Sequence, residues 1–147
     1  MGSKPLIYVC GPFRAETGEE IDQNIQNAVD TAVELAGMGF QPICPHLLGM
    51  RWPKHMTRMN DQFWLDLTME VMRRCDVIFC LSRWGDSVGC AAEIREANRL
   101  KIPWLQEFSE ALGFLAGWEE AQKGGAYGRF GSNMRSACSE CVQEPSS

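Results

Sequence analysis

The sequence predicts a small α/β domain built on a doubly wound parallel sheet of about four to five strands. Two observations indicate this class. Short apolar runs rich in β-branched residues alternate with longer segments in which apolar residues recur every three or four positions, and the connections between them are short. Strands and helices that alternate in this way join through right-handed crossovers, which make the strands parallel. We expect the domain to span residues 1–123 and the glycine- and serine-rich residues 124–147 to form a flexible tail.

The first strand and the first helix are the most regular part of the pattern. Residues 6–10 form an apolar, β-branched run that stops at a Gly-Pro pair, which is typical of a central strand followed by a turn. Thr17 and Glu20 have the spacing of a capping box, which predicts a helix start. The helix ends at Gly37 and Gly39, and its apolar stripe consists of Ile21, Ile25, Ala28, Ala32 and Leu35.

The middle of the chain predicts an edge strand, a long loop and a second helix. Residues 40–44 form the strand, which Pro42 places at the edge of the sheet. Residues 47–60 form the longest irregular segment, and long loops in small domains are often functional. Asp61 caps the following helix, whose apolar stripe consists of Phe63, Leu67 and Val71.

The second half of the domain continues the alternation. Residues 76–81 form a strand buried on both faces, opened by Asp76, which we interpret as a structural residue of the helix-to-strand turn. A helix over residues 91–100 and a strand over residues 102–106 follow. The last helix covers residues 109–123, with apolar Leu112, Leu115 and Trp118. Phe114, Leu115 and Trp118 could also support self-association.

Charge and cysteine content exclude several classes of function. A net charge of −5 provides no basic surface for a nucleic-acid polymer. The chain has neither a signal-peptide pattern nor a run near the ~18 apolar residues of a membrane span, so we expect a cytoplasmic protein without a membrane partner. Cys10, Cys75 and Cys80 fit buried reduced thiols. Cys138 and Cys141 have metal-ligand spacing, but one pair falls short of the roughly four ligands of a zinc site, so we expect no metal and no organic cofactor.

Several residues follow the predicted strands at the carboxyl edge of the sheet, where open α/β folds bind ligands. A glycine turn there lets backbone amides approach a ligand, and a helix start offers unpaired donors to an anion such as a phosphate. Ser87 and Gly89 supply the small residues that such a turn needs. Trp84 could stack on a base as well as pack on the rim. The other candidate binding residues are Gly11, Pro12, Phe13, Arg14 and His46.

Glu93 is the candidate catalytic residue. It follows this turn in the early part of the third helix, and the small residues Gly89, Ala91 and Ala92 suggest open space above its carboxylate. A carboxylate that the helix dipole keeps ionised can act as a nucleophile toward an electrophilic carbon. A surface glutamate that only favours the dipole has the same position, so the residue pattern leaves both interpretations open.

Three segments resemble the nucleoside 2-deoxyribosyltransferase superfamily, in particular its DUF4406 branch and the related deoxynucleoside 5′-monophosphate N-glycosidases. They are residues 7–14, residues 75–77 and the block Trp84-x-x-Ser87-x-Gly89-x-x-x-Glu93. The resemblance spans about residues 5 to 107 and implies a flavodoxin-like fold and a homo-oligomer. It also implies that Glu93 attacks the anomeric carbon of a nucleoside or nucleotide, with Gly11, Ser87 and Gly89 around the sugar and Arg14 near a phosphate. Water then gives hydrolysis, and a second base gives transfer.

One position departs from that family pattern. The characterised glycosidases carry an aspartate eight positions before the aspartate that opens the third strand, and here that position is Thr68. General acid help to a departing base is worth about 10²–10⁴ in rate. Asp66 and Glu70 turn about 160–200° away from Thr68 on a helix. Other acids stay open, and so does a catalytically inactive nucleotide-binding or sensing module; the remaining candidate acids are Asp61, Asp86, His46 and His55.

Overall fold

The structure, a computed structural model, describes residues 2–48 and 61–124. Its centre is a sheet of four parallel strands in the order β2-β1-β3-β4. The strands are β1 (Leu6–Cys10), β2 (Gln41–Ile43), β3 (Val77–Cys80) and β4 (Trp104–Leu105). This order matches the first four strands of the flavodoxin-like arrangement. The predicted fold class is therefore confirmed, and β2, which contains Pro42, is an edge strand as expected.

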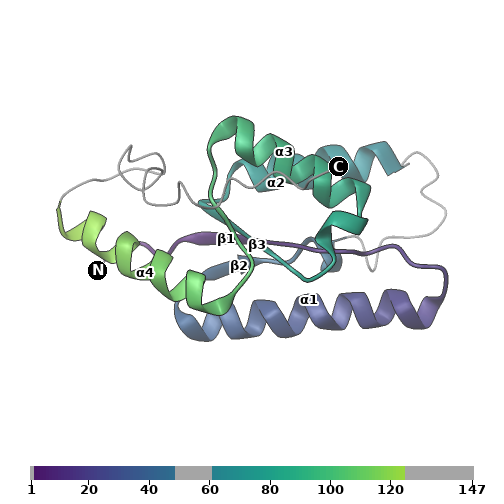
Figure 1. The fold of residues 1–147 in the computed structure, drawn as a ribbon, viewed down its shortest axis with the longest axis horizontal. Helices are drawn as coiled ribbons and strands as arrows, with labels where there is room; N and C mark the ends of the chain where they lie inside the picture. Colours follow the sequence, from purple (N-terminus) through teal and green to yellow (C-terminus); the bar gives the residue numbers. More distant parts are fainter. Residues whose placement is uncertain (1, 49–60, 125–147) are drawn as a thin grey trace.

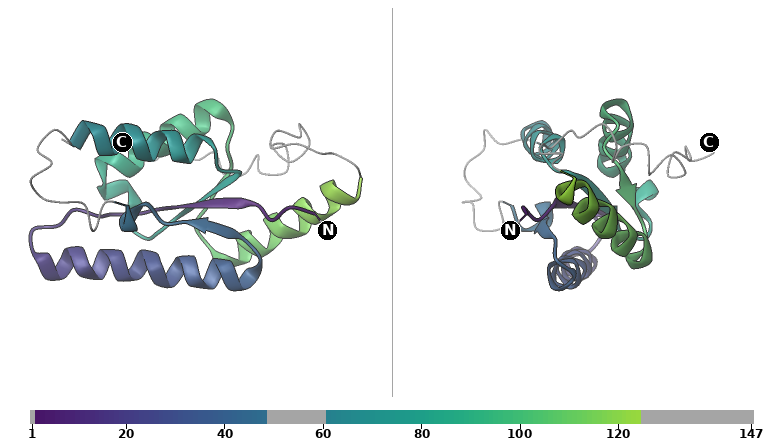
Figure 2. Two further views of the ribbon diagram at one scale, coloured as in Figure 1. Left: turned by 180° about the vertical axis from the view of Figure 1, so that it is seen from behind. Right: turned by 90° about the vertical axis from the view of Figure 1, so that its left-hand side faces the viewer.

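Four helices cover the sheet in two layers (Figures 1 and 2). Helices α1 (Gly18–Met38) and α4 (Phe108–Lys123) lie on one face, and α2 (Asp61–Arg73) and α3 (Val88–Leu100) lie on the other. Two short 3-10 turns, η1 (Pro45–Leu47) and η2 (Trp84–Asp86), follow β2 and β3. Because the strands are parallel, these two turns lie at the same edge of the sheet.

The alternation of side chains along the strands divides the core in two. Ile7 and Val9 of β1 belong to the cluster under α1 and α4. Tyr8 and Cys10 face the opposite way, into the cluster under α2 and α3. Because β1 pairs with β3 in register, Cys10 lies opposite Cys80 on that second face. This places one tyrosine and two thiols on the inner side of α2 and α3.

The helix ends follow local capping chemistry. Thr17 and Glu20 form the predicted capping box, and Gly39 closes α1 with a left-handed φ of 119°. Gly37, expected at the helix end, lies inside α1. Ser87 accepts a hydrogen bond from the backbone N–H of Cys90 and caps α3, which therefore begins three residues before the expected start.

Two helices bury different side chains from those expected. Met72 is the fully buried residue of α2, whereas the predicted stripe is only half-buried. In α4 the small Ala111 is buried and Leu112 is 59% exposed, because Ala111 lets the helix approach the sheet closely.

The other apolar residues of α4 pack within the chain. Phe114 stacks on Phe40, and the Trp118 indole donates to the Ser3 carbonyl at 2.7 Å. Leu115 packs against the core cluster under α1 and α4. Phe114, Leu115 and Trp118 therefore have partners within the chain, and self-association through them stays a prediction.

The expected loop over residues 47–60 and the expected tail fall largely outside the described residues: η1 includes Leu47, but residues 49–60 and 125–147, with His55, Cys138 and Cys141, are not described. None of the described helices has the length and apolar character needed to cross a bilayer.

Candidate functional site

Glu93 lies in the second turn of α3, with its carboxylate directed at β1. It is 7% exposed. Among the described residues, Glu93 and His46 are the polar or charged side chains that are buried. The Tyr8 hydroxyl donates to Oε1 at 2.6 Å, and the Cys10 thiol donates to Oε2 at 3.3 Å. Each carboxylate oxygen therefore has its own donor from one strand.

The protonation of this pair follows from burial. Loss of solvent raises the pKa of Glu93 above its usual value, while the hydrogen bonds from Tyr8, Cys10 and Thr68 lower it. Burial, followed by the charge of Glu93, raises the pKa of Tyr8 well above its usual value, so the phenol stays a donor. The expectation that the helix dipole keeps Glu93 ionised needs correction. The dipole acts mainly in the first turn, and the donors of β1 support the ionised form instead.

Two thiols, those of Cys10 and Cys90, lie beside this carboxylate, and a third, that of Cys80, contacts Cys10. Cys10 and Cys80 face each other across β1 and β3, and Cys90 lies on α3 one turn before Glu93. Sγ of Cys10, Sγ of Cys90 and a carboxylate oxygen of Glu93 all lie within 4.8 Å of one another. The hydrogen bond with Cys80, together with burial, raises the pKa of Cys10, and the contact with Cys10 raises that of Cys90. All three are free cysteines, as the sequence predicts for Cys10 and Cys80.

Thr68 approaches the same group from α2. Its hydroxyl lowers the pKa of both Glu93 and Tyr8, and it also donates to the Leu65 carbonyl at 3.2 Å. Thr68 therefore lies beside the candidate nucleophile. A threonine there can share a hydrogen bond, but it cannot supply an acidic proton at neutral pH.

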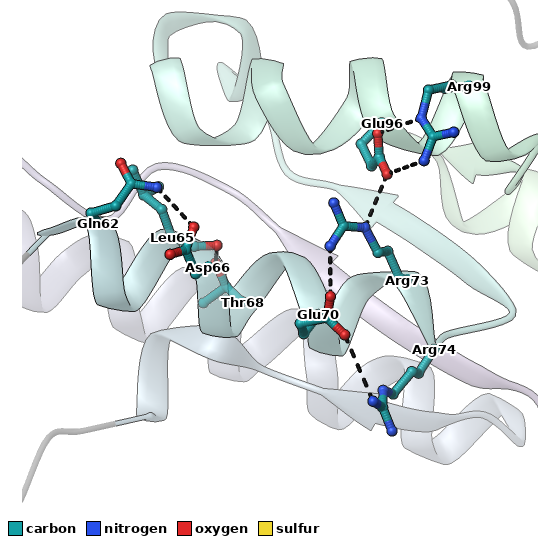
Figure 3. Close-up of polar contacts among 9 residues, drawn as sticks. All are labelled: Gln62, Leu65, Asp66, Thr68, Glu70, Arg73, Arg74, Glu96 and Arg99. Carbon is teal, nitrogen blue, oxygen red and sulfur yellow. Dashed lines mark hydrogen bonds and ion pairs between the residues drawn. The ribbon is translucent and has the colours of Figure 1, made fainter.

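The acidic neighbours of Thr68 point elsewhere, as helical geometry predicts (Figure 3). Asp66 accepts from Gln62 at 2.8 Å, and Glu70 pairs with Arg73 at 2.7 Å. Neither carboxylate is directed at Glu93.

Arg73 also forms an ion pair with Glu96 of α3 and so links α2 to α3 (Figure 3). Arg99 and then Arg73 lower the pKa of Glu96 to about 2, which keeps this surface carboxylate ionised. Glu96 is therefore a glutamate one turn from Glu93 that is paired with arginines, whereas Glu93 is buried against Tyr8 and Cys10.

The other candidate acids either have partners elsewhere or lie outside the described residues. Asp86 pairs with Arg83 at 2.9 Å on the surface. The side chain of Asp61 and the whole of His55 lie outside the described parts of the chain. His46 is 5% exposed, and burial lowers its pKa, so it is neutral near pH 7.

His46 joins two of the other predicted site residues. Its Nε2 lies 3.1 Å from the Pro12 carbonyl, which can only accept, so Nε2 carries the proton. The Phe13 ring meets the imidazole edge to face at 6.0 Å between ring centroids. His46, Pro12 and Phe13 therefore form one group at the ends of β1 and β2.

The remaining predicted residues have local structural contacts. A Cβ on buried Gly11 would lie 2.4 Å from Leu81 Cδ1, so close packing requires glycine there. Trp84 packs on Trp104 with ring centroids 5.3 Å apart. A Cβ on Gly89 would lie 3.4 Å from Leu65 Cδ2, so the Leu65 side chain borders the space expected above Glu93. Arg14 is exposed beyond the end of β1.

One family model matches the chain, over residues 5–106. The chain belongs to the DUF7768 family. DUF7768 is a domain of unknown function, and a comparison with curated proteins finds no match. The DUF7768 match begins one residue before β1 and ends one residue after β4, so it includes the whole sheet and leaves α4 outside. Likeness to the nucleoside 2-deoxyribosyltransferase superfamily stays a prediction.

Sequence reasoning found the carboxylate within the DUF7768 domain but missed its partners. Tyr8, Cys10 and Cys90 looked like ordinary core residues. The sequence contains a signal for them. Tyr8 and Cys10 are two positions apart, so they share one face of a strand that is otherwise apolar, and both can form hydrogen bonds. Buried tyrosine hydroxyls normally have a partner, and Glu93 is that partner here.

Proposed function

We propose that this protein cleaves or exchanges the N-glycosidic bond of a nucleoside or nucleoside 5′-monophosphate, with Glu93 as the nucleophile. The observation that supports the proposal is the buried carboxylate held by Tyr8 and Cys10 beneath the carboxyl edge of the sheet. A buried carboxylate with donors on both oxygens is positioned rather than mobile, which favours attack on a fixed carbon.

The two oxygens suit different roles. Oε1 accepts the short bond from the Tyr8 hydroxyl, whereas Oε2 accepts only a longer bond from a thiol, which is a weak donor. Oε2 therefore attacks the anomeric carbon and forms an ester, and the bond from that carbon to the base nitrogen breaks. The base retains the electron pair and takes up a proton. Water then cleaves the ester and regenerates the carboxylate, or a second base takes the sugar.

A specific observation favours a second candidate, a nucleotide-binding or sensing module without catalysis. Thr68 occupies the position beside Glu93 where the resemblance implies an acid, and the described alternatives Asp66 and Asp86 are paired on the surface. Without protonation a nucleobase leaves poorly. Binding would then persist while turnover is slow or absent.

Release of free base decides between the two. The purified protein is incubated with a panel of nucleosides, deoxynucleoside 5′-monophosphates and NAD, and free base is measured by chromatography. We expect release from at least one compound and its loss in Glu93→Gln. Glu96→Gln on the same helix is the matched control and keeps the release. Tight binding without release, unchanged in Glu93→Gln, supports the sensing module, and no binding at all refutes both.

Arg14 provides a test of the phosphate. We expect Arg14→Ala to weaken binding of monophosphates more than binding of nucleosides, because an exposed arginine at the end of β1 offers bidentate donors to a phosphate. Equal weakening of both ligand classes would remove Arg14 from phosphate recognition. A cytoplasmic location and a homo-oligomer stay predictions of the sequence.

A further inference from the structure

We propose that Cys10, Cys90 and Glu93 form a binding site for Zn²⁺. The residue pattern does not predict this site, because Cys10 lies far from Cys90 and Glu93 along the chain, and Cys90 and Glu93 alone do not form a metal-binding motif. Folding brings the end of β1 against the first turns of α3 and joins two thiols and one carboxylate. Thiolate and carboxylate oxygen are both established zinc ligands.

The spacing of the three ligand atoms suits one ion. Zinc binds sulfur at about 2.3 Å and carboxylate oxygen at about 2.0–2.2 Å, so two ligands on a tetrahedral ion lie about 3.5–3.8 Å apart. Cys10 Sγ and Glu93 Oε2 are 3.3 Å apart, and all three ligand atoms lie within 4.8 Å. Side-chain shifts of up to about 1 Å therefore bring them into coordination. The fourth position is left for a water molecule.

Tyr8 supplies the support that a ligating carboxylate needs. Ligands of metal sites are usually oriented by hydrogen bonds from a second group. The Tyr8 hydroxyl holds Oε1 at 2.6 Å, which leaves Oε2 turned toward Cys10 and Cys90. Tyr8 is fully buried, so this orientation does not compete with solvent.

Binding changes the chemistry of the site. Two S–H bonds break, both protons pass to solvent, and two S–Zn bonds and one O–Zn bond form, so the site with its ion carries a net charge of −1. The ion then occupies Oε2. If the proposed function holds, Zn²⁺ inhibits base release by blocking the attacking atom; the metal site itself does not depend on that function.

Cobalt provides the readout, because cobalt bound by thiolates shows an intense charge-transfer absorption. The experiment uses the full chain with Cys138→Ser and Cys141→Ser, because the Cys138-x-x-Cys141 pair has metal-ligand spacing and could bind cobalt itself. Because the three ligands are buried, the reduced protein is refolded from urea with Co²⁺ and then titrated with Zn²⁺. We expect one equivalent of Co²⁺ with thiolate absorption, displaced by one equivalent of Zn²⁺.

Variants in the same background identify the ligands. Cys90→Ser and Glu93→Gln are expected to lose affinity at least tenfold, and Tyr8→Phe about 10–100-fold, as for other groups that hydrogen-bond a metal ligand. Cys44→Ser, outside the cluster, retains the absorption. A metal-dependent rise in the urea midpoint, absent in Glu93→Gln, provides a second measurement if a cysteine variant fails to fold. Absence of thiolate absorption in the parent protein, or an unchanged affinity for Co²⁺ in Cys90→Ser, overturns the proposal. Base release is assayed separately, so a missing glycosidase activity does not change this result.

Discussion

Removal of one hydroxyl tests the geometry around Glu93. In Tyr8→Phe the ring keeps its packing, but Oε1 loses a donor at 2.6 Å in a fully buried position. A hydrogen bond to a charged group contributes about 1.5–3 kcal/mol, so we expect the free energy of unfolding to fall by that amount at pH 7. Urea unfolding followed by circular dichroism, with a chelator present, measures the change.

The pH dependence of this loss has a definite sign. Burial raises the folded pKa of Glu93 above its unfolded value of about 4.3. The stability linked to its protonation is therefore complete below about pH 4 and is lost as the pH rises through the folded pKa. Without the Tyr8 hydroxyl the folded pKa rises further, because that bond lowers it, and the loss at pH 7 deepens.

The Glu93→Gln background supplies the control. There the bond joins two neutral groups and contributes about 1 kcal/mol, so Tyr8→Phe should cost less and its effect should not change between pH 4 and pH 7. An equal loss in both backgrounds, independent of pH, would refute the role of Tyr8 as a donor to an ionised carboxylate.

Three further changes test other parts of the structure. Gly11→Ala places a Cβ 2.4 Å from Leu81 Cδ1 and should lower the free energy of unfolding by about 1–3 kcal/mol in urea, whereas Gly18→Ala, with open space, should not. Burial lowers the folded pKa of His46, so its stability contribution is complete above about pH 6.5 and is lost as the pH falls through the folded pKa; thermal unfolding of His46→Gln should lack this slope. Thr68→Asp should raise base release by about 10²–10⁴ if only the acid is missing, and Thr68→Asn should not; equal rates in the two variants would contradict that role.

The architecture could be predicted from the sequence because each element has a strong local signal. The apolar run of β1, the capping box of Thr17 and Glu20, and Pro42 at the edge each depend on nearby residues alone. The errors arise where tertiary packing decides. Ala111, a weakly apolar residue, is buried because only a small side chain allows α4 to approach the sheet, while Leu112 turns to solvent.

The site was harder to predict than the fold. Glu93 could be identified by its place after a small-residue turn, but its donors come from a strand more than eighty positions earlier. Which strand lies under α3 depends on the order of the sheet. The alternation of β1 indicates that Tyr8 and Cys10 share a face, whereas their distance to Glu93 required the assembled structure.

Asp76 affects the site from the opposite end of the sheet. Its carboxylate accepts from the Leu6 N–H at 2.8 Å, and its own N–H donates to the Leu6 carbonyl at 2.9 Å. No hairpin fixes the alignment of parallel β1 and β3, so this paired contact sets which residues stand opposite each other. A slip of β1 by one residue would turn Tyr8 and Cys10 toward α1 and α4 and replace them with Ile7 and Val9 beneath Glu93. Asp76 thus fixes the alignment of β1 with β3, and the identity of the side chains beneath Glu93 depends on a contact at the other end of the strands.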